Sequence, residues 1–191
     1  MENDVEFINC TKCGKREKLI CSLQEGTTPF IILGESPAKD GWIESKRAFY
    51  NTKGKLQASG RVLEKLLNNI GYSINDIYFT EMCKCILFDR KELDSCIKNC
   101  FPFLVKQLLS LNSSVKIIVT MGKNSTQAFL NKKIKTFSEI VGSVTTVNIE
   151  GREFILLPIY HPSPLNPLGY KGNETPFNTL KELTENNCCN K

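Results

Sequence analysis

The stretch "PFIILGESPAKD" (residues 29–40) passes from an apolar run into a polar loop that contains a proline. Short apolar runs bounded by turn residues are typical of buried strands. The same character is found in "DIYFTEM" (76–82), "VKIIVTMG" (115–122) and "EFILLPIY" (153–160). We therefore predict four buried strands, of which the first occupies residues 29–35.

Segments with helical periodicity separate the first three runs. "SGRVLEKLLNNIGY" starts at Ser59, a common N-cap residue, and ends near Gly71. The segment 89–111 has acidic residues early and a proline, Pro102, that is expected to kink or divide the helix. A third helix is predicted at 122–131.

The segment after these helices adds one more strand. "VTTVNIE" (144–150) is expected to pair as a hairpin with residues 153–159, across Gly151. No internal repeat, low-complexity segment or long linker interrupts the pattern.

Alternating strands and helices predict an α/β fold, a three-layer sandwich in which a central, mostly parallel four-stranded sheet is flanked by helices. The length suits a single domain over 1–191, with an N-terminal cysteine clip at 8–25 and a disordered tail at about 186–191. Functional sites of such sheets gather at the carboxyl ends of the strands. The loops "GESPAKD", "TEMCKC" and "YHPSPL" all follow predicted strands.

The composition bears on where the protein acts and on what it binds. A net charge of +5 is compatible with approach to phosphate but is too small to predict a nucleic-acid partner. No stretch approaches the roughly 20 apolar residues that cross a bilayer, and the start "MENDVEFIN" does not resemble a signal peptide. We expect a cytoplasmic monomer with no membrane partner.

Nine cysteines in a chain of this kind indicate metal ligation or redox chemistry more than a disulfide framework. Cys10 and Cys13 form a Cys-x2-Cys clip, which is half of a metal or cluster site. Spacing alone leaves zinc, an iron-sulfur cluster and plain buried thiols open. It also does not choose the other two ligands.

Four segments together resemble the uracil-DNA glycosylase superfamily, and most closely its iron-sulfur branch, the family-4 enzymes. "GESPAKD" is similar to the branch's first motif, and "AFYNTKGKLQASGRVLEKLL" to its Phe-containing turn and following helix. "IYFTEMCKC" with "NCFPFLVKQL" resembles its second strand and cysteine-bearing helix, and "YHPSPL" resembles its last motif. The resemblance covers about residues 10–168.

The resemblance implies a [4Fe-4S] cluster with a structural role, held by four cysteines, with zinc as the alternative. The cysteines at the family's positions are Cys10, Cys13, Cys85 and Cys100. Cys83 and Cys96 remain substitutes, because they lie two residues from Cys85 and one helical turn from Cys100.

The resemblance also implies a DNA repair glycosylase that flips uracil or a related deaminated base out of DNA and hydrolyses its N-glycosidic bond. His161, the only histidine, is then the donor to the departing base's carbonyl oxygen. Glu35 and Asp40 are the candidates to position the water, or else they cap a turn. Gly34 and Ser36 belong to the same binding loop. We expect a monofunctional enzyme, because no lysine is placed as a Schiff-base nucleophile.

Base flipping needs a stacking ring, a wedge and a grip on the backbone. Phe49 resembles the family's stacking phenylalanine, with Tyr50 as the alternative. Leu165 is the expected wedge, with Leu168 as the second choice. Phosphate is expected to be held by Ser163, by the backbone N–H groups of Ser163 and Leu165, and by Lys171.

Two positions depart from the family's uracil specificity. Ala38 is small where some family members place a bulky tyrosine, which leaves room for a broader substrate range. Glu81 stands where the family has asparagine, and an ionised carboxylate offers only acceptors to the base. Either burial keeps Glu81 protonated so that it mimics the amide, or the preferred base presents donors.

Two other functions remain open on the sequence. A non-catalytic, metal-stapled nucleic-acid-binding module of the same fold is the main alternative, and Glu81 is the feature that favours it. A thiol redox protein built on "CTKC" is disfavoured, because the clip neither follows a strand nor opens a predicted helix.

Overall fold

The computed structural model describes residues 10, 12–13, 23–38, 41–87, 89–130 and 132–188. Within these ranges the chain forms one sheet in the strand order β2-β1-β3-β5-β4. The strands are β1 (Phe30–Gly34), β2 (Tyr78–Glu81), β3 (Ile117–Met121), β4 (Thr145–Ile149) and β5 (Arg152–Ile159). All neighbours pair in parallel except β4 and β5.

The predicted α/β sandwich is confirmed, although the described sheet has five strands and not four. The additional strand is β4, which pairs with β5 as the predicted hairpin. Its turn places Glu150 at φ 48° and Gly151 at φ 89°. Positive φ at both central residues is the requirement of the two-residue hairpin turn that matches strand twist, and glycine meets it without steric cost.

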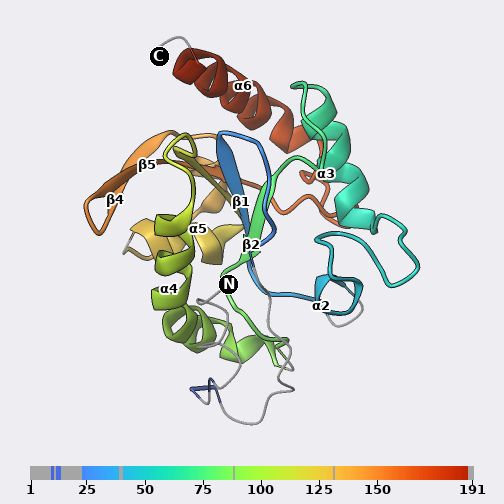
Figure 1. Cartoon of the computed structure of the whole chain (residues 1–191), viewed down its shortest axis with the longest axis vertical. Helices are drawn as coiled ribbons and strands as arrows, with labels where there is room; N and C mark the ends of the chain where they lie inside the picture. Colours follow the sequence, from blue (N-terminus) through green and yellow to red (C-terminus); the bar gives the residue numbers. More distant parts are fainter. Residues whose placement is uncertain are drawn as a thin grey trace.

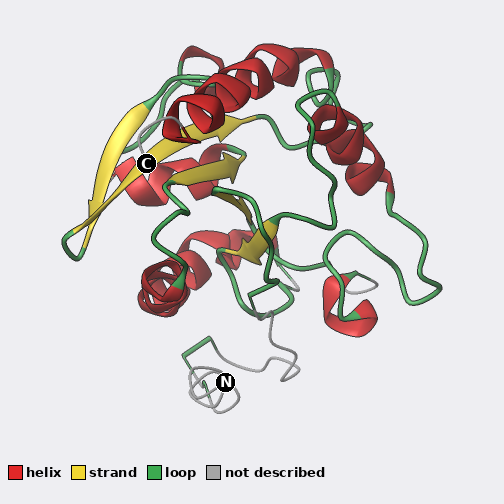
Figure 2. Ribbon diagram, turned by 45° about the horizontal axis from the view of Figure 1, so that its top comes forward, coloured by secondary structure: helices red, strands yellow, loops and turns green. Residues whose placement is uncertain are grey.

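Helices cover both faces of the sheet (Figures 1 and 2). One face carries α3 (Ala58–Asn68) and α6 (Glu174–Cys188), and the other carries α4 (Leu93–Ser110) and α5 (Lys123–Leu130). Alternate side chains of β1 separate into the two cores: Phe30 and Ile32 pack toward α3 and α6, while Ile31 and Leu33 pack toward α4. This alternation explains why β1 is apolar at every position.

Four short helical segments lie in the loops. They are α2 (Trp42–Ser45) and the 3₁₀ turns η2 (Arg90–Glu92), η3 (Phe137–Glu139) and η4 (Lys171–Asn173). Of these, α2 and η2 follow β1 and β2 along the chain and stand beside the carboxyl edge of the sheet.

Three helical predictions differ from the structure. The first helix begins at Ala58 after Gln57 as N-cap, so Ser59 is not the cap. Pro102 does not divide α4, since buried residues on both sides of it, including Cys96 and Leu104, pack into the same core. This shared burial compensates for the one backbone hydrogen bond that proline removes. The helix α6 was not predicted at all.

The ends of the chain are described only in part. Helix α6 extends to Cys188, inside the segment predicted as a tail, and residues 189–191 lie outside the described residues. Most of the predicted clip at 8–25 also lies outside them. No helix within the described ranges is long and apolar enough to cross a membrane.

Candidate active site at the carboxyl edge of the sheet

A cavity of about 400 Å³ opens where β1, β2, β3 and β5 end. Because these strands are parallel, the residues that follow them meet at one edge of the sheet. The lining side chains come from the strand ends, α2, the start of α3 and η2: Gly34, Glu35, Ser36, Pro37, Ala38, Gly41, Trp42, Phe49, Gln57, Ser59, Phe79, Glu81, Arg90, Met121 and His161.

The cavity brings together all the described residues that were predicted to contact the base or the water. They are Gly34, Glu35, Ser36, Ala38, Phe49, Glu81 and His161. Asp40, the second candidate for the water, lies outside the described residues. A larger cavity, of about 860 Å³, lies between α4, α5 and the β4–β5 hairpin, but none of the predicted site residues lines it.

Glu35 is held at both carboxylate oxygens. Asn124 donates from Nδ2 to Oε1 at 3.0 Å, and Arg90 pairs through Nη2 with Oε2 at 2.5 Å. The Glu35 side chain is 15% exposed, whereas that of Arg90 is 69% exposed. Glu35 is therefore a fixed, nearly buried carboxyl group at the cavity wall, and its partner guanidinium is largely exposed to solvent.

Glu81 has a buried carboxyl oxygen, Oε2, with no hydrogen-bond partner among the described residues. Burial, and to a lesser degree repulsion from Glu35, raises its pKa to about 8, against the attraction of Lys84. At neutral pH the folded protein therefore carries Glu81 mainly as the protonated acid. A Cβ at Gly34 would lie 2.0 Å from Oε2, so only glycine lets the carboxyl group occupy this position.

Lys84, three residues after Glu81, is 2% exposed. Its Nζ donates to Thr80 Oγ1 at 2.8 Å, to Gln107 Oε1 at 2.6 Å and to the Glu81 backbone oxygen at 2.6 Å. These neutral acceptors compensate for loss of water around a buried cation.

His161 follows β5 in a loop that one asparagine anchors. Asn173, fully buried, accepts from the Tyr160 N–H at 2.8 Å and donates to the Tyr160 and Gly169 oxygens at 2.9 and 3.0 Å. The residue as a whole is exposed, but its ring lines the cavity, where loss of water lowers its pKa below 6.5. The imidazole is thus neutral at pH 7 and carries one N–H that can donate.

Phe49 is one of three aromatic residues that line the cavity, together with Trp42 and Phe79. It adopts φ 66° and packs against Phe79 with ring centroids 4.6 Å apart. Tyr50 points elsewhere, since its hydroxyl donates to Asn75 Oδ1 at 3.0 Å and its ring lies under Arg47. The geometry therefore supports Phe49 over Tyr50 as a stacking surface.

The loop after His161 presents apolar side chains to solvent. Leu165 is 93% exposed and Leu168 is 45% exposed, as expected of side chains that could enter DNA. The two N–H groups predicted to hold phosphate are used within the loop, by Ser163 to the His161 oxygen at 2.8 Å and by Leu165 to Ser163 Oγ at 3.3 Å. Lys171 remains exposed at η4.

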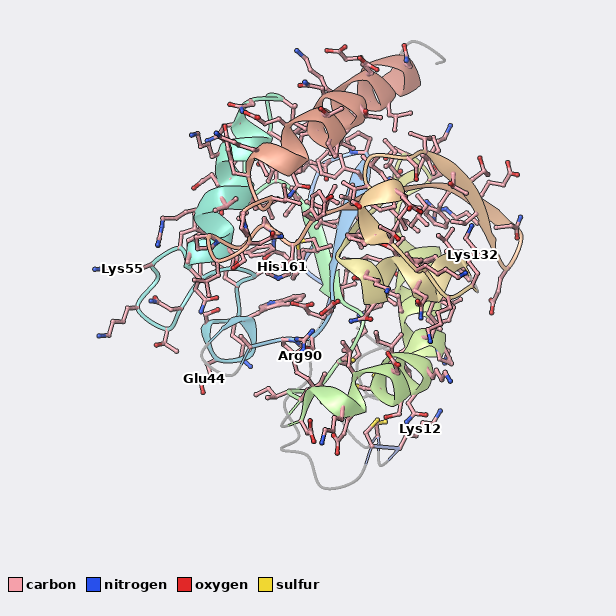
Figure 3. The ribbon with its side chains drawn as sticks, turned by 180° about the vertical axis from the view of Figure 1, so that it is seen from behind. Lys12, Glu44, Lys55, Arg90, Lys132 and His161 are labelled. Carbon is pink, nitrogen blue, oxygen red and sulfur yellow. The ribbon has the colours of Figure 1, made fainter. Side chains whose placement is uncertain are left out.

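The cysteines gather around one end of α4. Asn99 Nδ2 contacts Cys13 Sγ at 3.2 Å, and the Lys84 N–H donates to Cys100 Sγ at 3.4 Å. Lys12 also lies over the Phe103 ring of α4, 5.3 Å from its centroid (Figure 3). Through the first contact, Cys13 lies beside Asn99, the neighbour of Cys100. Through the second, the backbone next to Cys85 contacts Cys100 itself.

Within the described ranges no three Cys, His, Asp or Glu side chains come close enough together to hold a metal ion. The thiol chemistry present is that of an iron-sulfur ligand set, because Cys13 Sγ contacts Asn99 of α4, and Cys96 Sγ and Cys100 Sγ lie 3.9 Å apart on α4. Cys10 is exposed, and Cys83 is buried with its Sγ 3.9 Å from the Leu93 oxygen. Contact with Cys96 and burial raise the pKa of the Cys100 thiol.

Three residues of the site were not found from the sequence. Arg90 and Asn124 are 55 and 89 residues from Glu35 along the chain, and Asn173 is 13 residues from Tyr160. Asn124 follows β3, so the rule that sites gather after parallel strands could have included it. No local pattern marks Arg90 or Asn173.

Comparison with known proteins agrees with this geometry. A family model described as the uracil DNA glycosylase superfamily matches residues 22–183. A type-4 uracil-DNA glycosylase of Archaeoglobus fulgidus is 25% identical over 187 residues, which cover 93% of this chain and 89% of the relative. The corresponding enzyme of Sulfurisphaera tokodaii is 27% identical over 187 residues, covering 93% and 81%. That of Pyrobaculum aerophilum is 24% identical over 166 residues, covering 81% and 78%.

Proposed function

Since the chain belongs to the uracil-DNA glycosylase superfamily, we propose that it is a monofunctional DNA repair glycosylase that hydrolyses the N-glycosidic bond of uracil or a related deaminated base. The observation that carries this proposal is the shared cavity of Glu35, Phe49, Glu81 and His161 at the carboxyl edge of the sheet. These residues supply a carboxylate, an aromatic face, a group for the base edge and a neutral donor. DNA that contains the damaged base is the partner.

In the proposed reaction the base leaves the helix stack and enters the cavity. Its ring stacks on Phe49, and Leu165 fills the gap in the duplex, which offsets the few kcal/mol that unstacking costs. Ala38 leaves space beside the base. Ser163 and Lys171 contact the DNA backbone through the Ser163 hydroxyl and the lysine ammonium group, because the loop N–H groups are already engaged.

Bond cleavage then depends on two groups. The C1′–N bond breaks, the base leaves as an anion, and the neutral N–H of His161 stabilises negative charge on its carbonyl oxygen. Glu35 holds the water whose oxygen bonds to C1′, and a proton from that water neutralises the departing base. No covalent bond to the protein forms, so the product is free base and an abasic site.

Glu81 decides which base edge is accepted. In its protonated form the carboxyl group has one O–H donor and one acceptor, the same pair that the amide of asparagine presents to uracil. The raised pKa and the unpartnered Oε2 both support this form. The carboxylate form would instead favour a base that presents donors.

Base release from defined oligonucleotides tests the function. Single- and double-stranded oligonucleotides that carry uracil, hypoxanthine, xanthine or a thymine mismatch are incubated with the protein, treated with alkali and examined for cleavage. We expect cleavage at uracil, and no covalent adduct after borohydride treatment. A borohydride-trapped adduct would overturn the monofunctional mechanism.

A non-catalytic nucleic-acid-binding module is the second candidate, because Glu81 replaces the family's asparagine. The same oligonucleotides decide between the two. Tight, salt-sensitive binding with no cleavage of any strand supports the module and contradicts the glycosylase.

For the cofactor we propose a [4Fe-4S] cluster held by Cys10, Cys13, Cys85 and Cys100. When bound, it would supply structural cross-linking between the N-terminal clip and α4, with no part in bond cleavage. The N–H donors of Lys84 and Asn99 would stabilise thiolate charge at Cys100 and Cys13.

Two matched cysteine variants test the ligand set. We expect the protein purified without oxygen to contain iron and to absorb broadly in the visible range. Cys100→Ala should lose the iron and melt at a lower temperature, whereas Cys83→Ala should keep the iron, although it also removes a buried thiol. Iron content by elemental analysis and melting by circular dichroism provide the measurements. Iron lost in Cys83→Ala would assign that ligand position to Cys83 in place of Cys85, and iron retained in Cys100→Ala would assign the other to Cys96 in place of Cys100.

A further inference from the structure

Arg90 has a position that the reaction described above does not explain. It stands at the start of η2, lines the cavity and pairs with Glu35; Figure 3 labels its position. Among the described residues that line the cavity it is the only lysine or arginine. Together with burial, its charge lowers the pKa of His161, so the guanidinium lies near both catalytic groups.

The two partners of the Arg90–Glu35 ion pair differ in their exposure to solvent. Glu35 is 15% exposed and remains attached through Oε1 to Asn124, whereas Arg90 is 69% exposed. An ion pair with a solvent-exposed partner shifts an equilibrium only about fivefold or less, because water and salt screen it. Arg90 can therefore leave Glu35 at little cost, while Glu35 stays in place.

Binding of DNA brings negative charges together at the cavity and therefore requires such a cation. The Glu35 carboxylate lines the space into which the nucleotide must move, and a DNA strand brings a phosphate on each side of that nucleotide. A guanidinium has five N–H donors in a planar fork that suits phosphate oxygens, and a charged phosphate contact is stronger than an exposed carboxylate pair. The exposed part of Arg90 is available to the incoming strand.

We propose that Arg90 exchanges partners. In the free protein it pairs with Glu35, and in the DNA complex it binds a phosphate next to the extruded nucleotide. This exchange leaves Glu35 Oε2 free to hold the attacking water, while Asn124 keeps the carboxylate oriented. The inference rests on the proposed function, and it assigns to Arg90 a phosphodiester site and a link between DNA binding and water positioning.

The test combines a protein variant with a modified strand. The probe is a uracil oligonucleotide with a 2′-fluoro sugar that blocks cleavage, in which the phosphates flanking the uridine are replaced one at a time by neutral methylphosphonate. For wild type, one of these replacements should weaken binding roughly tenfold, which is the expected loss of one charged hydrogen-bonded contact. In Arg90→Gln the same methylphosphonate replacement should cause no further loss of affinity. The slope of log affinity against log salt should fall by about 0.9 in this variant.

Lys91→Gln is the matched control, because Lys91 is the exposed neighbour of Arg90 and does not line the cavity. The affinity of Lys91→Gln should change with each methylphosphonate by the same factor as that of wild type. Arg90→Lys should keep the wild-type slope of log affinity against log salt. With cleavable DNA, Arg90→Gln should raise KM and keep kcat within about threefold. A fall in kcat at unchanged KM would instead mean that Arg90 stays on Glu35 during the reaction, and would overturn the exchange.

The outcome is separable from that of the proposed function. Suppose that the protein releases uracil, but each methylphosphonate weakens binding by the same factor in wild type and in Arg90→Gln. This result overturns the exchange alone. Absence of base release overturns the proposed function, and the binding cycle still shows whether Arg90 contacts the phosphate.

Discussion

Replacement of His161 by alanine is expected to slow base release about 100- to 1,000-fold, which corresponds to the roughly 2.7–4 kcal/mol that one donor to a developing oxyanion supplies. The reason is that His161, the only histidine of the sequence, lines the cavity, and in the proposed reaction its neutral imidazole donates to the carbonyl oxygen on which negative charge develops. Single-turnover kinetics on a uracil oligonucleotide measure this effect on the rate constant of bond cleavage, to which product release does not contribute.

The fold should not suffer from this substitution. His161 is exposed, and Asn173 anchors the loop through the backbone of Tyr160 and Gly169 and not through the ring. His161→Asn, which retains an N–H donor, should recover part of the rate. Equal single-turnover rates for wild type and His161→Ala would contradict the assignment of the donor, provided that both variants melt at the same temperature.

The second large effect is expected at Glu81, where the pH dependence of uracil release should follow one buried carboxyl group. Its pKa of about 8 means that the protonated form, which can face uracil, predominates at neutral pH. Above that value, release should fall about tenfold per pH unit, because the carboxylate offers no donor and repels the base oxygen. In Glu81→Asn the rate should lose this alkaline decline. Rates on uracil DNA from about pH 6 to pH 10 provide the comparison.

Stability should change with pH in the same direction. The pKa is raised from 4.5 in the unfolded chain to about 8 in the folded protein, so the folded state binds this proton more tightly. The resulting stabilisation is fully present below 4.5 and is lost as pH rises to about 8, on the order of 4–5 kcal/mol at 1.36 kcal/mol per pH unit.

Glu81→Gln has no proton to lose at this position. It should therefore raise the melting temperature relative to wild type at about pH 8–9 more than at about pH 4, and circular dichroism at several pH values measures the difference. The matched control is Glu150→Gln, an exposed carboxyl group in the hairpin turn far along the chain. Parallel melting curves for wild type and Glu81→Gln over the whole pH range would refute the buried acid. They would also remove the explanation of uracil recognition.

Much of the framework is readable from local sequence. The apolar runs, their alternation with helices and the turn glycine Gly151 predict the strands and the hairpin, since side-chain period and positive φ are properties of a few neighbouring residues. The same reasoning placed Glu35, Glu81 and His161 after strands, and parallel pairing then requires them to meet at one edge. The family motifs added a role for each.

The tertiary structure alone decided the electrostatics of the site. The sequence left Glu81 as either an acid or an anion, and only its burial beside Gly34, where Oε2 has no hydrogen-bond partner in the described part of the chain, selects the acid. Likewise Arg90 meets Glu35 although the two are 55 positions apart in the sequence, and Pro102 stays inside α4 because the core holds both halves of the helix. Desolvation, ion pairing and packing depend on atoms that are distant in the chain, and no local period encodes them.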